Sequence, residues 1–333
     1  MTALGLKRFL PGYAARWRRG FGLLLEHVHR LVPEMRFGDD DTVPWLEREG
    51  LRFFGFANTP KETEQLALLQ RFMPREMPAG HYRLVKDYVT RFLYPHMRPD
   101  VTPEGIHSGN WGGFHGQHKE TLADYAPCDA DGHGAGLLPK AFAFRPDDVV
   151  IDGGCFIGMG DIHVAGLVPG GHVYALEADA ACHALLERNL SFNAVANVTG
   201  FHRAVWNTDT VIDLESGSAQ ANSLVSEVVA GQEKRPVRTI SIDQLVAERD
   251  VRKVDMISLT LNGAEVEALE GAAETLRRFR PRVRLPGWYT RQGVAIKDLA
   301  VKALASAGYR AWATPRGNVL ALHAGQCREG TGR

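Results

Sequence analysis

The 333-residue sequence lacks the features that mark several large classes of protein. It has four cysteines with no Cys-x-x-Cys pair, which argues against a disulfide framework or a zinc knuckle and is typical of a reducing compartment. Lys+Arg and Asp+Glu are equal at 39 each, so no overall charge attracts nucleic acid. No apolar run approaches the ~20 residues of a membrane-spanning helix. We therefore expect a cytoplasmic chain that binds no nucleic acid.

The N-terminus departs from this neutral balance. Before Glu26 the only charged residues are basic, namely Lys7, Arg8, Arg16, Arg18 and Arg19. Large apolar residues then recur every three or four positions, at Tyr13, Trp17, Phe21, Leu24, Val28 and Leu31, which predicts one apolar helical face. The apolar block at 21–25 is too short for the ~7–15-residue core of a signal peptide. Such a helix either makes peripheral contact with an anionic membrane or docks on its own domain, and the sequence leaves both interpretations open.

Composition and periodicity divide the chain into four segments. The first is predicted to be helical, because Thr59-Pro60-Lys61-Glu62 forms a capping box before one apolar face and a second helix is expected at 80–94. The second is a His- and Gly-rich loop without periodicity, expected to line the site. The third alternates strand and helix, and the last is expected to be a disordered tail. The predicted bounds are 1–105, 106–140, 141–325 and 326–333.

The third segment predicts an α/β fold with an open, mostly parallel sheet of the Rossmann-like kind. Strands are expected at 148–152, 172–177, 197–204, 253–261 and 281–285. Helices are expected at 159–167, 179–193, 242–248, 264–278 and 294–307. Residues 309–324 then predict an antiparallel hairpin at the C-terminal end. In such a sheet, ligands bind at the carboxyl ends of the strands.

The first of these strands runs into the glycine-rich stretch VVIDGGCFIGMG. Its glycines (Gly153, Gly154, Gly158 and Gly160) fit the dinucleotide pattern Gly-x-Gly-x-x-Gly poorly, since no Gly-x-Gly pair stands where the strand ends. A phosphate-binding P-loop is excluded, because no Gly-Lys-Ser/Thr follows. Asp152 stands at the strand terminus instead, where a carboxylate would repel a pyrophosphate but suits a cationic amino group.

The second strand, HVYALEAD, ends in Glu177. An acid at this position can accept hydrogen bonds from both ribose hydroxyls of an adenosine. Asp152, the glycines and Glu177 together describe a cofactor with a ribose, no phosphate and a cationic amino-acid portion, which is S-adenosylmethionine. The alternative is that Glu177 only caps the helix that starts near Asp179.

Four blocks of the sequence carry a family resemblance. VVIDGGCFIGMG, VYALEADAACHALLERNLSFNAVANVTGFHRAV, TISIDQLV and VDMISLTLNGAEVEALEGAAETL stand in the order and spacing of FkbM-type methyltransferases, which the chain resembles from about 140 to 325. The resemblance implies a class I methyltransferase fold. It also implies methylation, with S-adenosylmethionine, of a hydroxyl oxygen on a sugar, a polyketide or a lipid-linked small molecule.

Carried over residue by residue, the resemblance implies a cofactor site in three parts. The methionine portion would lie in the turn formed by Asp152, Gly153, Gly154, Cys155 and Gly158. The ribose would lie at Glu177 and Ala178, and the adenine near Ala204.

The resemblance fails in the part of the site where the acceptor would react. The family typically has Lys-Ile-Asp-Val-Glu-Gly-Ala-Glu on its fourth strand, whereas residues 258–265 read Ser-Leu-Thr-Leu-Asn-Gly-Ala-Glu. Thr260 can orient an acceptor by hydrogen bonding but cannot take its proton. Glu265 is interpreted as an acid that stabilises a helix N-terminus.

We therefore look for a base upstream, in IHSGNWGGFHGQHKET, where His118 and His115 are the candidates. Solvated histidines without a role fit this loop equally well. Although His115 and His118 have the spacing of metal ligands, no helix is indicated to set their geometry, so no metal is expected.

Two other functions stay open. One is a methyltransferase fold that binds the cofactor without catalysis and serves as a scaffold, which the neutral Thr260 and Asn262 favour. The other is an NAD-binding oxidoreductase, which the glycine spacing disfavours.

Overall fold

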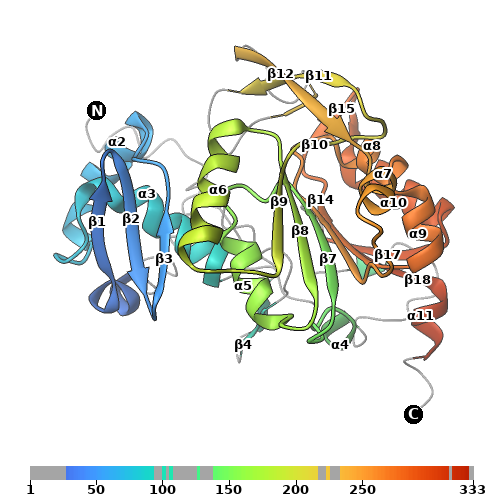
Figure 1. Cartoon of the computed structure of the whole chain (residues 1–333), viewed down its shortest axis with the longest axis horizontal. Coiled ribbons are helices and arrows are strands. Elements are labelled where there is room, and N and C mark those ends of the chain that lie inside the picture. Colours follow the sequence, from blue (N-terminus) through green and yellow to red (C-terminus); the bar gives the residue numbers. More distant parts are fainter. Residues whose placement is uncertain are drawn as a thin grey trace.

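The computed structural model describes residues 28–93, 100–102, 105–107, 126–127, 138–216, 223–225, 233–314 and 317–329. Within them a large α/β body carries a smaller unit of three strands and short helices at its N-terminal side (Figure 1). The basic segment before Val28 lies outside the described residues, so its contact with a membrane stays a prediction. No helix in the described ranges is long and apolar enough to cross a membrane.

The large body is built on an eight-stranded sheet with the order β6-β17-β18-β14-β13-β7-β8-β9. Its strands, in chain order, are β6 (Ala126–Pro127), β7 (Val149–Gly153), β8 (His172–Glu177), β9 (Val198–His202), β13 (Met256–Leu259), β14 (Arg282–Pro286), β17 (Tyr309–Ala313) and β18 (Asn318–His323). The pairs β9–β8, β8–β7, β7–β13 and β13–β14 are parallel, and β18 runs antiparallel between β14 and β17. Counted from β7, the order is 3-2-1-4-5-7-6 with an added edge strand, which is the class I methyltransferase arrangement expected from the sequence.

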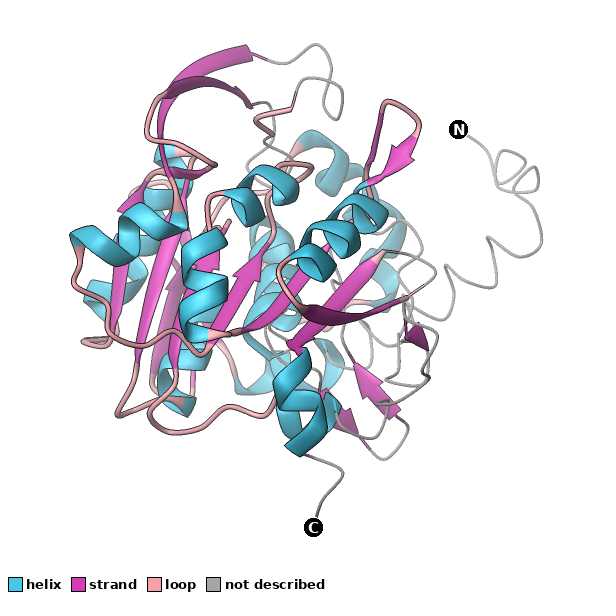
Figure 2. Cartoon of the chain, turned by 90° about the vertical axis from the view of Figure 1, so that its right-hand side faces the viewer, coloured by secondary structure: helices cyan, strands magenta, loops and turns pink. Residues whose placement is uncertain are grey.

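Helices cover both faces of this sheet (Figure 2). On one face lie α5 (Met159–Leu167) and α6 (Ala180–Phe192); on the other lie α7 (Ile242–Glu248), α8 (Glu265–Glu270), α9 (Ala273–Phe279) and α10 (Ile296–Ser306). Because successive strand residues point to opposite faces, Val150 joins the core under α5 and α6, whereas Ile151 joins the core under the other four. The helix predicted at 264–278 is two helices, broken around Gly271, where a Cβ would lie 2.3 Å from the carbonyl oxygen of Trp206.

The described N-terminal residues are only partly the helical region that we predicted from the sequence. Helices lie at 60–69 and 82–93, but they follow an antiparallel sheet of β1 (Arg36–Asp40), β2 (Val43–Arg48) and β3 (Leu51–Phe54) that we did not predict. The signal in the sequence that we missed is the Glu49-Gly50 pair between β2 and β3. Both residues have positive φ angles, of 54° and 80°, and so form the kind of tight turn that matches the twist of two paired strands. The capping-box prediction is confirmed, because the Thr59 hydroxyl accepts from the Glu62 amide at the start of α2 (Pro60–Leu69).

The remaining described elements are short. They are the 3₁₀ turns η2 (Val32–Glu34), η3 (Gln70–Phe72) and η4 (Ala79–His81), the helices α3 (Tyr82–Asp87) and α4 (Leu138–Ala141), the π-helix η5 (Tyr88–Leu93), and the strands β4 (Asp100–Thr102), β5 (Gly105–His107), β10 (Ala204–Val205), β11 (Val211–Ser216), β12 (Glu233–Ile240), β15 (Thr290–Arg291) and β16 (Val294–Ala295). Strands β10, β12 and β11 form a separate sheet that the sequence analysis did not predict. The first part of the tail predicted to be disordered is instead helical, in α11 (Ala324–Glu329), where the Gln326 side chain accepts from the His323 amide and Cys327 is buried. Residues 330–333 lie outside the described residues.

The N-terminal unit is joined to the large body by the side chain of Asn189. This α6 residue is fully buried; its oxygen accepts from the Phe54 amide at 2.7 Å, and its nitrogen donates to the carbonyls of Phe54 at 3.1 Å and Ile157 at 2.9 Å. One side chain therefore forms hydrogen bonds with the backbone at the edge of β3 and with a carbonyl of the turn before α5. Apolar residues of both parts, among them Phe53 and Val150, belong to one continuous core.

Replacing Asn189 should test this connection. Asn189→Leu keeps the size of the side chain but leaves three buried polar groups of the backbone unpaired, so we expect the free energy of unfolding to fall by ~3 kcal/mol or more. Urea denaturation would measure the loss as a lower midpoint at unchanged slope. The control is Asn207→Leu, since Asn207 is only partly buried and its side chain donates a solvent-exposed hydrogen bond to Glu270. Equal stability of the two variants would contradict the role of Asn189.

Candidate functional site

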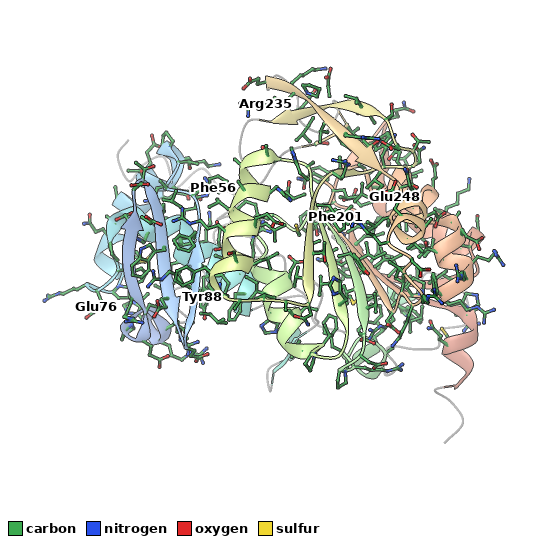
Figure 3. The ribbon with its side chains drawn as sticks, viewed as in Figure 1. Phe56, Glu76, Tyr88, Phe201, Arg235 and Glu248 are labelled. Carbon is green, nitrogen blue, oxygen red and sulfur yellow. The ribbon has the colours of Figure 1, made fainter. Side chains whose placement is uncertain are left out.

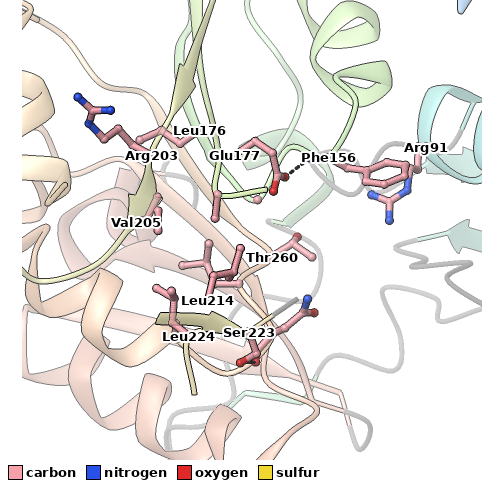
Figure 4. A pocket seen from close by; sticks show the side chains of 16 residues that line it. Arg91, Phe156, Leu176, Glu177, Arg203, Val205, Leu214, Ser223, Leu224 and Thr260 are labelled. Atoms are coloured by element: carbon pink, nitrogen blue, oxygen red, sulfur yellow. Dashed lines mark hydrogen bonds between the residues drawn. The ribbon is translucent and has the colours of Figure 1, made fainter. Parts of the chain in front are cut away.

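A pocket opens beyond the carboxyl ends of β7, β8 and β13, where the strand order reverses (Figure 4). The space inside it, including the part that is open to solvent, is about 610 Å³. The residues that line it are Arg91, Gly154, Phe156, Leu176, Glu177, Ala178, Arg203, Ala204, Val205, Leu214, Ser223, Leu224, Thr260, Leu261, Asn262 and Ala264. Four of the residues expected to bind the cofactor are among them: Gly154, Glu177, Ala178 and Ala204.

The glycine turn forms one wall of the pocket. Gly154 has a φ of +83°, and a Cβ there would lie 2.2 Å from the carbonyl oxygen of Thr260, so only glycine fits. Gly158, also left-handed at +78°, starts α5 and leaves room for the Leu186 side chain. Gly153 and the buried Cys155 support this turn without lining the pocket.

Glu177 stands at the end of β8 and is the one carboxylate among the described lining residues. Its two oxygens accept from the backbone amides of Phe156 at 2.8 Å and Asp179 at 2.9 Å. Burial raises the pKa of Glu177 to about 7, and these amide bonds oppose the rise. Helix α6 is capped by Asp179, whose side chain accepts from Ala181 and Cys182. Glu177 is therefore not the capping residue that was its alternative interpretation, and its remaining lone pairs are available to the pocket.

Asp152 lies beside the pocket rather than in its lining. In the register of the sheet, Asp152 pairs with Ser258, and Ser258 pairs with Arg284. An acidic and a basic residue therefore lie on either side of a serine on three adjacent strands. Burial raises the pKa of Asp152 to about 6, although the Ser258 hydroxyl and the Arg284 guanidinium lower it. Burial and the Asp152 carboxylate raise the pKa of Asp161 well above its usual value. The contact of Asp152 with a cofactor amino group stays a prediction.

Thr260 and Asn262 reach the pocket from the end of β13, and each is bound by a side chain from farther along the chain. The Arg284 guanidinium donates to the Thr260 hydroxyl oxygen at 3.2 Å, and the Tyr289 hydroxyl donates to the Asn262 side-chain oxygen at 3.2 Å. Arg284 is buried. Its role was not expected from the sequence, although a basic residue inside a short apolar strand was a visible signal.

Glu265 closes the turn that carries Thr260 and Asn262. It is fully buried, and its carboxylate accepts from the amides of Leu261 at 3.0 Å and Gly263 at 2.9 Å. Burial raises the pKa of Glu265 to about 7. Its role is thus more specific than the general stabilisation of a helix N-terminus that we expected.

The histidines proposed as bases, His115 and His118, lie outside the described residues. No histidine is found among the described residues that line the pocket. Across the described ranges, no three His, Cys, Asp or Glu side chains are grouped to hold a metal ion.

Comparison with known families agrees with this geometry. Residues 161–311 match the family described as the methyltransferase FkbM domain. This part of the chain is therefore similar to FkbM methyltransferase domains. The match begins after the glycine turn, so Gly154 and Arg91 lie N-terminal to it. Among curated proteins, no sequence matches the chain.

Solved structures are similar at low identity. The FkbM methyltransferase of Methylobacillus flagellatus is 14% identical, with 54% of this chain and 44% of that chain covered and a TM-score of 0.39. The precorrin-6y C5,15-methyltransferase of Geobacter metallireducens is 14% identical, with coverage of 55% and 82% and a TM-score of 0.35. A putative methyltransferase of Streptococcus mutans, solved with SAH, is 11% identical, with coverage of 55% and 92% and a TM-score of 0.34. The chain thus spans less than half of the Methylobacillus protein.

Gly154→Ala should show how tightly the turn approaches β13. The left-handed backbone alone costs ~1–2 kcal/mol for alanine, and the contact with the Thr260 carbonyl adds to this cost. Gly50→Ala is a matched control, because Gly50 has a φ of +80° and nothing within 4 Å of its Cβ position. We expect the urea midpoint to fall clearly further for Gly154→Ala. If both variants lose the same stability, the close approach of Gly154 to the Thr260 carbonyl does not contribute to the free energy of unfolding.

Proposed function

We propose that this chain is an S-adenosylmethionine-dependent methyltransferase that methylates a hydroxyl oxygen of a small acceptor, such as a sugar, a polyketide or a lipid-linked molecule. The observation that carries the proposal is Glu177, the one carboxylate among the described lining residues, which stands at the end of the second strand of a class I methyltransferase sheet and within the stretch that matches the FkbM family. The small acceptor and a cytoplasmic location stay predictions from the sequence.

The pocket suits the chemical groups of this cofactor. Glu177 has lone pairs left for the two ribose hydroxyls. Beside it, Ala204, Val205, Leu214 and Leu224 provide the apolar surface that an adenine ring needs. The sharp glycine turn lets backbone approach the methionine portion closely. The cofactor itself supplies an electrophilic methyl group on a sulfonium.

The protein's own contribution at the acceptor is orientation. Because the Thr260 oxygen accepts from Arg284, its hydroxyl proton is free to point elsewhere, and we propose that it donates to the acceptor oxygen. Tyr289 holds the Asn262 amide in the same wall. Alignment of a nucleophile with the methyl group can supply most of the acceleration of such a displacement.

The acceptor proton still needs a base. Glu177 is the one carboxylate in the described lining and already binds two backbone amides, so we propose His118, or else His115, from the upstream loop. The scarcity of bases among the described lining residues favours a second function, in which the protein binds the cofactor without catalysing methyl transfer.

Calorimetric titration with adenosylmethionine and adenosylhomocysteine tests the proposal first. Binding of both ligands with no binding of NAD supports it; failure to bind either would overturn it. Release of adenosylhomocysteine with a panel of hydroxyl acceptors then separates the enzyme from the scaffold.

Glu177 should make cofactor binding depend on pH. An ionised carboxylate is the better acceptor of ribose O–H bonds, and its pKa in the free protein is about 7. The affinity for adenosylhomocysteine should therefore rise as pH increases from about 6 to 8. Glu177→Gln should bind ~10-fold or more weakly at the higher pH and lose most of this rise. An unchanged pH profile would place the ribose elsewhere.

Replacing the loop histidines tests the base. His118→Ala or His115→Ala should lower kcat by roughly 100-fold while the affinity for adenosylhomocysteine stays the same, and the pH–rate profile should lose its limb near ~6.5. Thr260→Val serves as the comparison, since loss of an orienting hydroxyl should lower the rate without removing that limb. Full activity in both histidine variants would leave alignment alone to explain the reaction.

A further inference from the structure

Arg91 enters the pocket from the N-terminal unit, far in sequence from the FkbM match at 161–311. It belongs to the π-helix η5, and π-helical turns are rare and frequent at functional sites. Its guanidinium carbon lies 4.3 Å from the ring centroid of Phe156, a residue of the glycine turn (Figure 4). Arg91 thus faces the turn expected to hold the methionine portion.

Aromatic contacts hold this arginine in place. Phe156 packs against Phe56 at 5.8 Å between centroids, and Arg83 covers the ring of Phe56 at 4.8 Å. Within η5, Tyr88 stacks on Phe92 at 5.0 Å with an interplanar angle of 20°. The labelled Phe56 and Tyr88 lie between the N-terminal sheet and the large body (Figure 3). Arg91 is therefore set in a packed junction and not on a loose surface.

Arg91 makes no salt bridge within the described part of the protein, although its charge lies near enough to Asp87 and Asp152 to lower the pKa of both. No described carboxylate lies within salt-bridge distance of its guanidinium, although other arginines of the junction, such as Arg83 and Arg188, have such partners. A half-buried guanidinium that presents a planar fork of donors to a pocket is suited to a carboxylate or a phosphate.

We propose that Arg91 binds the carboxylate of the amino-acid portion of adenosylmethionine. This inference rests on the proposed function. The position of Arg91 selects this end of the cofactor, because its partner Phe156 lies in the glycine turn and also donates its amide to Glu177. The other arginine of the lining, Arg203, lies on the opposite side of Glu177, next to Val205 at the adenine end (Figure 4).

The experiment compares two ligands that differ only in that carboxylate. Adenosylhomocysteine and its decarboxylated analogue are titrated by calorimetry into the full-length protein and into Arg91→Met. The wild type should prefer adenosylhomocysteine by roughly tenfold or more, the range of a charge-assisted hydrogen bond. Arg91→Met should bind the two ligands with nearly equal affinity, while its affinity for the decarboxylated analogue stays at the wild-type value.

Three controls decide the assignment. Arg203→Met removes an arginine from the adenine end and should keep the full preference. Arg91→Gln can still donate hydrogen bonds but carries no charge, so it should lose most of the preference for adenosylhomocysteine. It also replaces Arg91→Met in the comparison if Arg91→Met does not fold. Inorganic phosphate is titrated into protein saturated with adenosylhomocysteine, to detect an anion site for the acceptor.

The outcomes separate the inference from the function on which it rests. If the wild type binds adenosylhomocysteine and Arg91→Met keeps the full preference, the assignment of Arg91 is wrong while the proposed function stands. If that preference is kept but phosphate binding is lost in Arg91→Met, the arginine serves an anionic acceptor instead, which also overturns the assignment. A wild type that binds neither nucleoside overturns both proposals.

Discussion

The site depends on one buried amide, the side chain of Asn189. Its three hydrogen bonds join α6, the edge of β3 and the carbonyl of Ile157 in the glycine turn. The turn is held at the neighbouring residue by Glu177, which accepts from the Phe156 amide. Glycines make this turn sterically possible, but buried side chains outside the turn fix its position. A buried hydrogen-bonding group satisfied on all sides rigidifies its surroundings, because any displacement leaves an unpaired polar atom.

Buried carboxylates are concentrated where β7, β8 and β13 end. Burial raises the pKa values of Asp152, Glu177 and Glu265, and each of these carboxylates is offset by donors: an arginine and a serine for Asp152, and backbone amides for the other two. Ser258 lies between Asp152 and Arg284 in the register of the sheet, so the cation beside Asp152 comes from β14. The Arg284 guanidinium lowers the pKa of Asp152 and also donates to the Thr260 hydroxyl oxygen.

Most strands of the central sheet could be predicted because they are short, mainly apolar runs between turn residues. Helices α6 and α2 could be predicted because Asp179 and Thr59 cap them by local bonds. The N-terminal sheet could not be predicted so readily. Its strands are short and partly polar, and the Glu49-Gly50 turn reads as a hairpin only when the strands on both sides are recognised. Arg91 and Arg284 were missed for a different reason. Their importance comes from contacts with residues more than 20 positions away, namely Phe156 and Thr260, which no local pattern records.

The N-terminal unit is best understood as part of the site, not as an appended domain. Segments far apart in the sequence meet at the pocket, among them the π-helix with Arg91, the glycine turn with Phe156, and the end of β13 with Thr260. The FkbM match covers only the last of these. A continuous core runs from Phe53 through Ile157 to Val150, so a shift of the N-terminal sheet would be felt at the glycine turn. Selectivity for ligands can then change through the N-terminal unit while the sheet that holds the methyl-transfer fold stays the same.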